Sequence, residues 1–301
     1  MRSEWEIIAP DWPSPARVRS AFTLRTGGVS VSPYDSLNLG AHVGDAGDAV
    51  AENRRRVRGR LGLPAEPVWL QQVHGVEVAD LDAAGEPGAA ALGRDRAAGS
   101  RSGHEHVDGG PAVSPMSETP RADASARERA GAGLATSHTS APPRADAVVT
   151  RTPGRVCVIQ VADCMPVLFA ARDGSAVGAA HAGWRGLAGG VLEETVRKLA
   201  VPPQQLIAWL GPTIGQGHFE VGDDVRSAFV LRDPDTVFAF ETNARGRWQC
   251  DLYALARRRL SALGVRDVFG GSWCTYADAA RFFSFRRDGQ CGRMAALVWM
   301  E

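Results

Sequence analysis

The chain has 301 residues, of which 34 are Lys or Arg and 34 are Asp or Glu, so its formal net charge is zero. A balanced charge gives no general attraction to nucleic acid or to an anionic membrane surface. Hydrophobic residues make up 44% of the chain and charged residues 23%, which is typical of a globular protein with a sizeable core. No apolar run approaches the roughly 18 residues that a membrane span requires.

Short apolar runs alternate with amphipathic stretches from one end of the chain to the other. In chain order, we predict strands at 21–24, 68–70, 76–78, 156–161, 167–170, 176–180, 206–210 and 294–299. Apolar residues at helical spacing predict helices at 49–61, 189–199, 223–231 and 252–263. Asp251 is expected to cap the last helix, and Gly264 to follow its end. The pattern favours an α/β (α+β) fold, with a mixed β-sheet core covered by helices.

The segment from about Asp82 to Arg144 differs from the rest of the chain. It is rich in Ala, Gly, Ser, Pro and Arg and has almost no large apolar residues. Such a composition cannot bury enough apolar surface to offset the conformational entropy of the chain, so we predict a disordered, low-complexity insertion at 82–144. Because ordered sequence resumes at Ala145, we expect the insertion to lie within one domain that spans residues 1–301.

The five cysteines are scattered and form no Cys-x-x-Cys pair. An odd, dispersed set is atypical of a disulfide framework and indicates a reducing compartment. The first residues, MRSEWEIIAPDWPSP, carry charges and prolines where a signal peptide needs an apolar core. These features predict a cytoplasmic protein.

Cys164 and His181 are the first candidates for chemistry, because each follows an apolar, strand-like run. Their spacing of 17 positions leaves enough residues for a strand (165–171), a turn and a second strand (176–180). Two neighbouring strands of this kind can bring both side chains to one edge of a sheet. The spacing alone leaves a core role open, since free cysteines are usually buried small hydrophobes.

The residues around this pair add to the case for a site. Asp163 precedes Cys164 at the end of an apolar run, where a carboxylate is costly to bury without a partner. After His181 come AGWRGLAGG and an amphipathic helix. A glycine-rich turn at a helix start leaves backbone N–H groups free, and Arg185 adds positive charge, so the segment is suited to an anion. A tight turn with a surface arginine is the alternative.

A similar pattern occurs in TLRTGGVS, at residues 23–30. The N–H groups of Gly27 and Gly28 could form a nest that accepts an anion, with Arg25 as the counter-charge. The sequence FFSFRRD at 282–288 alternates aromatic and polar residues and could be the tip of a strand with exposed arginines.

His74, in WLQQVHG, is the third candidate ligand. It lies between two strand-like runs and before a glycine, which permits an unusual backbone angle. If the fold brings it to Cys164 and His181, the three make the catalytic zinc arrangement of three N/S ligands and one open position. A structural histidine in a turn is the alternative. The remaining histidines stand in loop-like or insertion sequence and are weaker candidates: His42, His104, His106, His138 and His218.

Together these segments resemble one known family, the YfiH-like proteins, which are also called laccase-domain, polyphenol oxidase or peptidoglycan-editing-factor proteins. The resembling blocks occur in family order and cover almost the whole chain apart from residues 82–144. They are TLRTGGVS, PYDSLNLGAHVGD, ENRRRV, WLQQVHG, ADAVVT, VADCMPVLFA, AAHAGWRGLAGGV, GPTIGQGHFEVG and FFSFRRDGQCGRMA. The chain departs from the family pattern in its long insertion and in Gln216-Gly-His218, where the family has a cysteine-containing stretch.

The resemblance implies a zinc site formed by His74, Cys164 and His181. It also implies a mixed α/β fold similar to the catalytic domain of cytotoxic necrotizing factor toxins. The implied activity is zinc-dependent phosphorolysis of purine nucleosides, namely adenosine, inosine and methylthioadenosine, together with adenosine deamination. The expected partners are therefore nucleosides and phosphate, with no nucleic acid or membrane, and the expected state is a monomer or a homodimer.

On this hypothesis Cys164, His181, His74 and Asp163 form the catalytic group, with Asp163 as the candidate proton carrier in deamination. For phosphorolysis, the groups suited to hold phosphate are Arg25, Arg185 and the N–H groups of Gly27 and Gly28.

Three other functions stay open. One Cys and two His could bind copper, with Met165 as an axial ligand, but a multicopper laccase needs more histidines than the seven in the chain supply. Cys164 and His181 could act without metal as nucleophile and base, in amide hydrolysis or in editing of peptidoglycan precursors. The chain could also be a partner-binding protein that uses its Arg-rich insertion.

Overall fold

The computed structural model describes residues 6–83 and 141–301, and all structural statements concern these residues. The predicted disordered insertion falls mainly on residues 84–140, which lie outside the described part of the chain.

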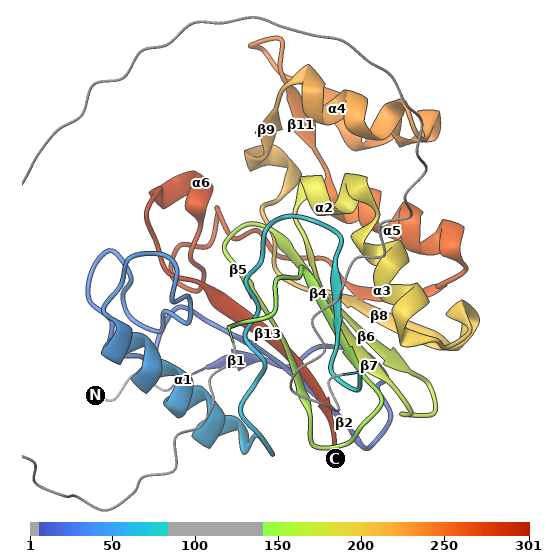
Figure 1. The fold of residues 1–301 in the computed structure, drawn as a ribbon. Coiled ribbons are helices and arrows are strands. Elements are labelled where there is room, and N and C mark those ends of the chain that lie inside the picture. Colours follow the sequence, from blue (N-terminus) through green and yellow to red (C-terminus); the bar gives the residue numbers. More distant parts are fainter. Residues whose placement is uncertain (1–5, 84–140) are drawn as a thin grey trace, which may run out of the picture. The chain divides into compact units, whose positions relative to one another are not determined.

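Two large sheets form the body of the molecule (Figure 1). A four-stranded antiparallel sheet has the order β1 (Ile7–Ile8), β2 (Val18–Thr23), β13 (Met294–Met300) and β5 (Val156–Val161). A six-stranded mixed sheet has the order β12 (Asp267–Gly270), β8 (Leu206–Leu210), β6 (Met165–Ala171), β7 (Val177–Ala182), β4 (Ala147–Thr150) and β3 (Val78–Asp80). A third, small sheet contains β10 (Phe240–Thr242), β11 (Trp248–Cys250) and β9 (Glu220–Val221).

The two large sheets pack against each other through alternate residues of their strands. Leu168 of β6 and Trp209 of β8 belong to the same buried cluster as Phe22 of β2 and Ile159 of β5. The Phe22 and Trp209 rings lie 6.4 Å apart, centroid to centroid. Because side chains alternate across a strand, the intervening residues of β6, such as Phe169, face the other way and join a second cluster.

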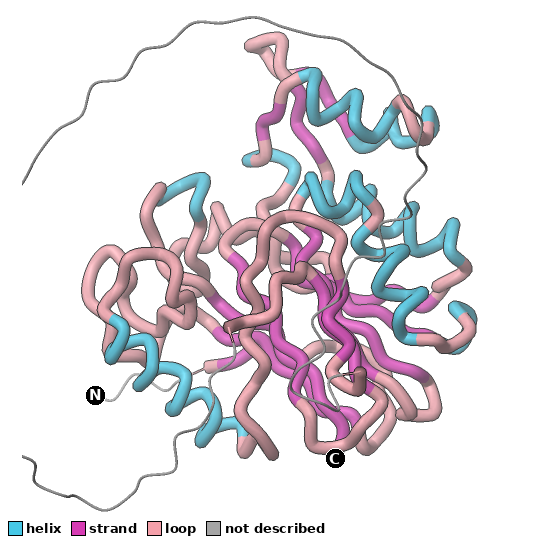
Figure 2. The backbone as a smooth tube through the Cα atoms, in the orientation of Figure 1, coloured by secondary structure: helices cyan, strands magenta, loops and turns pink. Residues whose placement is uncertain are grey.

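Helices cover the outer faces of both sheets (Figure 2). The apolar faces of α3 (Val191–Leu199) and α5 (Leu252–Leu263) pack on the six-stranded sheet. On the other side, Val57 of α1 (Gly47–Leu61) contributes to a cluster with residues of β5 and β13. The other helical segments are α2 (Trp184–Gly189), α4 (Asp223–Val230), α6 (Phe285–Asp288), and the 3-10 turns η1 (Pro203–Gln205), η2 (Gln216–His218) and η3 (Pro234–Ala239).

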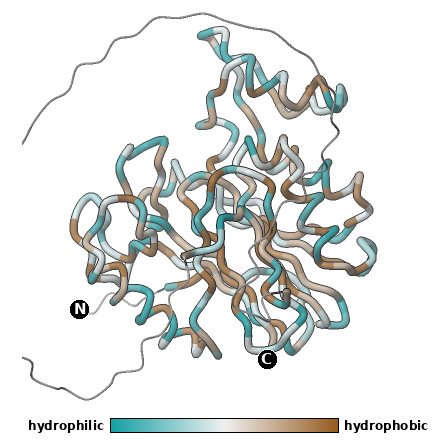
Figure 3. The backbone as a smooth tube through the Cα atoms, in the orientation of Figure 1, coloured by the Kyte–Doolittle hydropathy of each residue, from teal (hydrophilic) through white to brown (hydrophobic). Residues whose placement is uncertain are grey.

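The predicted mixed α/β class is confirmed, but the expectation of one sheet is wrong. The chain leaves the four-stranded sheet at the end of β5 and enters the six-stranded sheet at β6, so two strands that are adjacent in sequence lie in different layers. The crossing segment is residues 162–164, which places Cys164 where the two sheets meet. Figure 3 shows hydrophobic residues recurring along the strands of both sheets, as expected for strands buried on both faces.

Several local predictions can be compared with the structure. Asp251 caps α5 by accepting a hydrogen bond from the Ala254 N–H at 3.0 Å, and Gly264 follows the helix with φ 90°, as predicted. Residues 68–70 form no strand; only Gln71, next along the chain, makes an isolated bridge. FFSFRRD is not a strand tip either, because Ser284 caps α6 through the Arg287 N–H.

Within the described residues, no helix is both long and apolar enough to cross a membrane.

Candidate metal centre and cavity

The register between β6 and β7 brings Cys164 and His181 together. Pro166 pairs with His181 and Met165 with Ala182, so Cys164 stands opposite Gly183, at the end of the strand pair. A Cβ atom on Gly183 would lie 2.8 Å from Cys164 Sγ and 3.3 Å from the His74 ring. The backbone of Gly183 therefore forms one wall of the sulfur site, and only a residue without a side chain leaves room for the sulfur there.

His74 is fixed at the site by a residue that the sequence analysis did not select. The Asp146 carboxylate accepts hydrogen bonds from the N–H groups of Val73, His74 and Gly75, at 3.1, 2.9 and 2.7 Å. These bonds hold His74 in the left-handed region, with φ 62°. A non-glycine residue adopts that conformation only when its surroundings over-determine it, and Asp146 supplies the constraint.

The same carboxylate orients His181. Asp146 is fully buried, and its Oδ1 atom lies 2.9 Å from Nδ1 of the buried His181 ring. With Nδ1 occupied by the carboxylate, Nε2 of His181 is the nitrogen left for a metal. A carboxylate behind a ligating histidine is the usual outer partner in zinc sites.

The three predicted ligands converge. Their ligand atoms all lie within 4.8 Å of one another, and Cys164 Sγ is 3.8 Å from His74 Nε2. Tetrahedral zinc with ordinary bond lengths separates sulfur and nitrogen ligands by about 3.3–3.6 Å. Two imidazoles and one sulfur at this spacing fit a metal ion after a small side-chain adjustment. Among the described residues, this is the one group of three or more His, Cys, Asp or Glu side chains close enough to hold an ion.

The electrostatics of the triad favour an ionised sulfur. Burial by itself would raise the pKa of the Cys164 thiol, but the charge of His181 and the hydrogen bonds of His181 and His74 outweigh it and lower that pKa to about 6. For His181, burial lowers the pKa, while the Cys164 sulfur and Asp146 raise it to about 9. The thiolate is the form of cysteine that binds metal, so the site is prepared for an ion at neutral pH.

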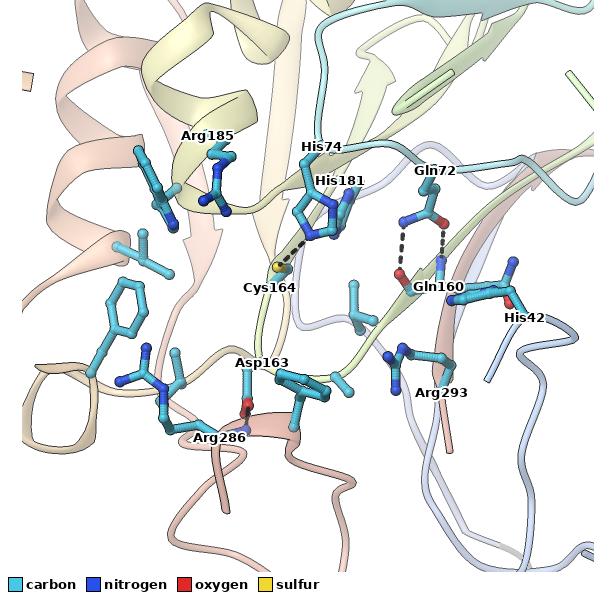
Figure 4. Close-up of a pocket in the computed structure, with 17 residues that line it drawn as sticks. His42, Gln72, His74, Gln160, Asp163, Cys164, His181, Arg185, Arg286 and Arg293 are labelled. Carbon is cyan, nitrogen blue, oxygen red and sulfur yellow. Dashed lines mark hydrogen bonds between the residues drawn. The ribbon is translucent and has the colours of Figure 1, made fainter. Parts of the chain in front are cut away.

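A cavity of about 320 Å³ opens beside the triad (Figure 4). His74, Cys164 and His181 contribute to its wall. The remaining wall contains apolar and aromatic residues, three arginines and two glutamines; its members are His42, Gln72, Gln160, Val161, Ala162, Asp163, Trp184, Arg185, Ile214, Phe219, Leu252, Phe285, Arg286 and Arg293. A pocket of this size and composition is suited to a small polar ligand with an aromatic part.

Asp163 lines the cavity, but its carboxylate is already used. Oδ1 accepts a hydrogen bond from Thr275 Oγ1 at 2.5 Å, and Oδ2 accepts one from the Arg286 N–H at 2.6 Å. Its backbone carbonyl accepts two more, from Thr213 and Ile214. The residue also has a positive φ of 82°. Asp163 therefore anchors α6 and the wall of the cavity, and this geometry argues for a positioning role instead of the proton-carrier role expected from sequence.

Three arginines reach the cavity from different elements. Arg185, in α2, stacks over Trp184 at 4.4 Å and makes no hydrogen bond or ion pair with any described residue. Arg286, in α6, lies over Phe219 and donates to the Glu220 carbonyl. Arg293 precedes β13 and donates to the carbonyls of Cys291 and Gly292. Arg185 was selected from sequence; the other two were not, although both belong to the block FFSFRRDGQCGRMA.

The other predicted phosphate residues are not brought to the cavity. Arg25 donates to the carbonyls of Asp35 and Ala279 and lies over the Phe283 ring. The N–H groups of Gly27 and Gly28 both donate to Ser36 Oγ, at 3.1 and 3.2 Å. The nest exists, but a hydroxyl of the same chain occupies it.

The other histidines, which the sequence analysis named as weaker candidates, and Met165 are not part of the triad. His42 lines the cavity on the side of Arg293. His218 lies with its Nδ1 3.5 Å from Cys274 Sγ, away from the triad. Met165 is fully buried in the hydrophobic cluster on the helix-covered face of the six-stranded sheet and does not line the cavity, so it is not placed as an axial metal ligand. His104, His106 and His138 lie outside the described residues.

Comparison with known proteins identifies what the chain is similar to. Residues 19–301 match the family model described as multi-copper polyphenol oxidoreductase laccase. A purine nucleoside phosphorylase of Pseudomonas aeruginosa is 45% identical over 295 residues, and purine nucleoside phosphorylase YfiH of Escherichia coli is 43% identical over 295. These alignments cover 98% of this chain and 98% and 99% of the two relatives. A crystal structure of a Neisseria meningitidis protein has 40% identity and a TM-score of 0.77, covering 98% of this chain and 99% of that one.

Proposed function

Since this chain belongs to the laccase-domain, or YfiH, family, we propose that it is a zinc-dependent purine nucleoside phosphorylase. The observation that carries the proposal is the convergence of His74, Cys164 and His181 at the wall of a cavity that three arginines also line. The proposed substrates are adenosine, inosine and methylthioadenosine, each with inorganic phosphate. The similarity to relatives that carry this name over nearly their whole length supports the reaction.

Zinc is proposed in preference to copper because of the donor set. Two histidines and one cysteine leave a fourth position for water or a substrate atom, and zinc bound there would supply a Lewis acid. A multicopper oxidase needs several copper sites, whereas the described residues supply one triad. Multicopper oxidase chemistry is therefore not part of the proposal, although the family model is described by that activity.

The arginines provide a place for phosphate. Arg185 has no partner among the described residues, and the Arg286 guanidinium uses one nitrogen on the Glu220 carbonyl, which leaves the rest of its fork for an anion. Charge-assisted hydrogen bonds from such forks are the strongest that a protein offers to phosphate. Phosphate held there would face the ribose as positive charge develops at C1′. The bond between Asp146 and His181 would keep the triad in place during the reaction.

Adenosine deamination is proposed as a second activity of the same site. The observation that favours it is that the triad faces the cavity where the nucleoside would bind, so that a purine ring carbon could reach the metal centre. Because both oxygens of Asp163 accept hydrogen bonds, we do not assign the proton transfer to that residue.

The proposal is tested by metal analysis and product analysis of the purified protein. We expect about one zinc per chain. Phosphorolysis would release the free base and ribose 1-phosphate only when phosphate is present, whereas deamination would convert adenosine to inosine without it. The variant Cys164→Ala should lose both zinc and turnover. Cys274→Ala removes another half-buried thiol that does not line the cavity, and should keep both.

Three results would contradict the proposal. Nucleoside turnover that survives in Cys164→Ala would reject a role for the triad. Turnover that survives complete removal of metal by a chelator would favour the metal-free Cys164–His181 reaction. Oxidation of phenols dependent on added copper, without nucleoside turnover, would favour the polyphenol oxidase alternative.

A further inference from the structure

Gln160, near the end of β5, has a polar side chain with an unmet hydrogen-bonding need. It lines the cavity and is only 5% exposed. Its Oε1 atom is buried and accepts no hydrogen bond from any described residue. A buried carbonyl oxygen without a partner costs about 1–3 kcal/mol, which a turn of the amide toward a hydrogen-bond donor in the cavity would recover.

The backbone of Gln160 is held in place on both sides. Gln72 donates from Nε2 to the Gln160 carbonyl at 2.9 Å and accepts from the Gln160 N–H at 2.8 Å. Figure 4 shows these two bonds as a pair beside the cavity. On the other edge, Gln160 pairs with Ala295 of β13. A fixed backbone with a side chain left unpaired is the arrangement expected of a recognition residue, because little ordering remains to be done when the ligand binds.

The surroundings of Gln160 differ from those of the proposed phosphate residues. Arg185 and Arg286 lie on one side of Cys164, and Gln160 lies on the other side with His42 and Arg293 (Figure 4). Arg185 stacks over Trp184, and Arg286 over Phe219. The exposed ring of Phe285 lies 5.9 Å below the Arg293 guanidinium. If phosphate occupies the first side, as proposed above, the base of the nucleoside must extend toward the second, where amide, imidazole and guanidinium groups are available.

We propose that Gln160 determines base specificity by hydrogen-bonding the purine edge formed by N1 and the substituent at C6; this inference rests on the proposed function. With adenosine, the amino group donates to Oε1 and Nε2 donates to N1. With inosine, N1–H donates to Oε1 and Nε2 donates to O6. The amide can hydrogen-bond both edges because it can turn about its last side-chain bond. A carboxylate could only accept hydrogen bonds, and an ammonium group could only donate them. Methylthioadenosine has the adenine edge and is read in the same way.

The test replaces the amide by a group that only accepts. In Gln160→Glu the carboxylate fits two neighbouring donors, which guanosine offers at N1–H and at its 2-amino group, and it repels the N1 lone pair of adenosine. We expect the ratio of kcat/KM for guanosine to that for adenosine to rise at least about tenfold over the unmodified enzyme. An unchanged ratio would overturn the proposal, because a merely structural role would lower both rates together.

A second variant keeps the inference testable if the buried carboxylate disturbs folding. In the unmodified enzyme, adenosine should be preferred about tenfold or more over purine riboside, which has no substituent at C6. Gln160→Leu should abolish that preference without changing zinc content or melting temperature. The matched control is Gln249→Leu on β11, since Gln249 Oε1 is also buried without a partner but lies away from the cavity. It should leave the preference intact.

The outcomes separate this inference from the proposed function. If the unmodified enzyme turns over no nucleoside, the proposed function fails. If it turns over nucleosides but its preferences do not respond to Gln160, only the assignment of the base edge fails, and Gln160 then faces the ribose or the phosphate.

Discussion

Two arginine- and glycine-containing segments of this chain look alike in sequence and differ in the structure. In TLRTGGVS, at 23–30, the arginine and glycine hydrogen-bond donors are used within the protein. Arg25 donates to two backbone carbonyls, and the N–H groups of Gly27 and Gly28 donate to Ser36 Oγ. In HAGWRGLAGG, at 181–190, the Arg185 guanidinium has no partner among the described residues, and the backbone of Gly183 lies against Cys164.

A donor-rich turn is therefore an anion site only if the rest of the fold leaves its donors free. In the first segment, the Ser36 hydroxyl, nine residues from Gly27 and eight from Gly28, accepts from both glycines, so an added anion would have to displace bonds that already exist. In the second, the donor is held at the cavity by stacking on Trp184, which uses the face of the guanidinium and not its N–H groups.

The largest contrast is expected from matched glycine substitutions. A Cβ at Gly28 would lie 2.1 Å from the Ser36 carbonyl oxygen, so Gly28→Ala should lower the free energy of unfolding by about 3 kcal/mol. At Gly183 the nearest atom is Cys164 Sγ, at the end of a short side chain. Gly183→Ala should destabilise less but lower zinc affinity about 10–100-fold, by displacing a ligand. Chemical denaturation and metal titration measure the two effects; equal effects of both variants on zinc would contradict the contrast.

A smaller contrast is expected from the arginines. Arg185→Ala should raise the KM for phosphate about tenfold, a loss of about 1.4 kcal/mol, while zinc content and melting temperature stay unchanged. Arg25→Ala removes hydrogen bonds from a largely buried guanidinium and should lower the free energy of unfolding by about 2 kcal/mol, without an effect on the KM for phosphate. Steady-state kinetics of both variants measure the KM for phosphate, and thermal melts measure the change in stability. Loss of zinc in Arg185→Ala would indicate a structural role instead.

A third contrast is a shift in a titration midpoint. The glycines of the first segment donate to the neutral hydroxyl of Ser36. In the second segment, His181 bonds to the Cys164 sulfur, whose pKa is lowered to about 6. Because the thiolate is the reactive form, alkylation of Cys164 in metal-free protein should be slow below pH 6 and reach its plateau above it. In His181→Asn the stabilising charge is lost, so the midpoint should move upward toward the ordinary value of 9.0. A midpoint near pH 9 in the unmodified protein would contradict the ion pair.

Much of the site could be predicted from the chain, because its ligands sit next to strand ends that the hydrophobic pattern reveals. The prediction of β6 and β7 on either side of a short turn gave the neighbouring strands that Cys164 and His181 require. Asp146 was missed, although the block ADAVVT contains it, because an aspartate before a strand looks like an ordinary turn residue. Only the contact with the 73–75 loop shows that its carboxylate organises the triad.

The sequence by itself determined the fold class, the family and the three candidate metal ligands, since strand periodicity and short sequence motifs are local properties of the chain. The tertiary structure alone decided that two large sheets stack on each other, that Asp163 is an anchor, and that Arg185, unlike Arg25, has no hydrogen-bond partner among the described residues. The physical reason is that a hydrogen-bonding group becomes available to a ligand only after the fold has taken every internal partner it can reach. Those partners come from residues that lie far away along the chain.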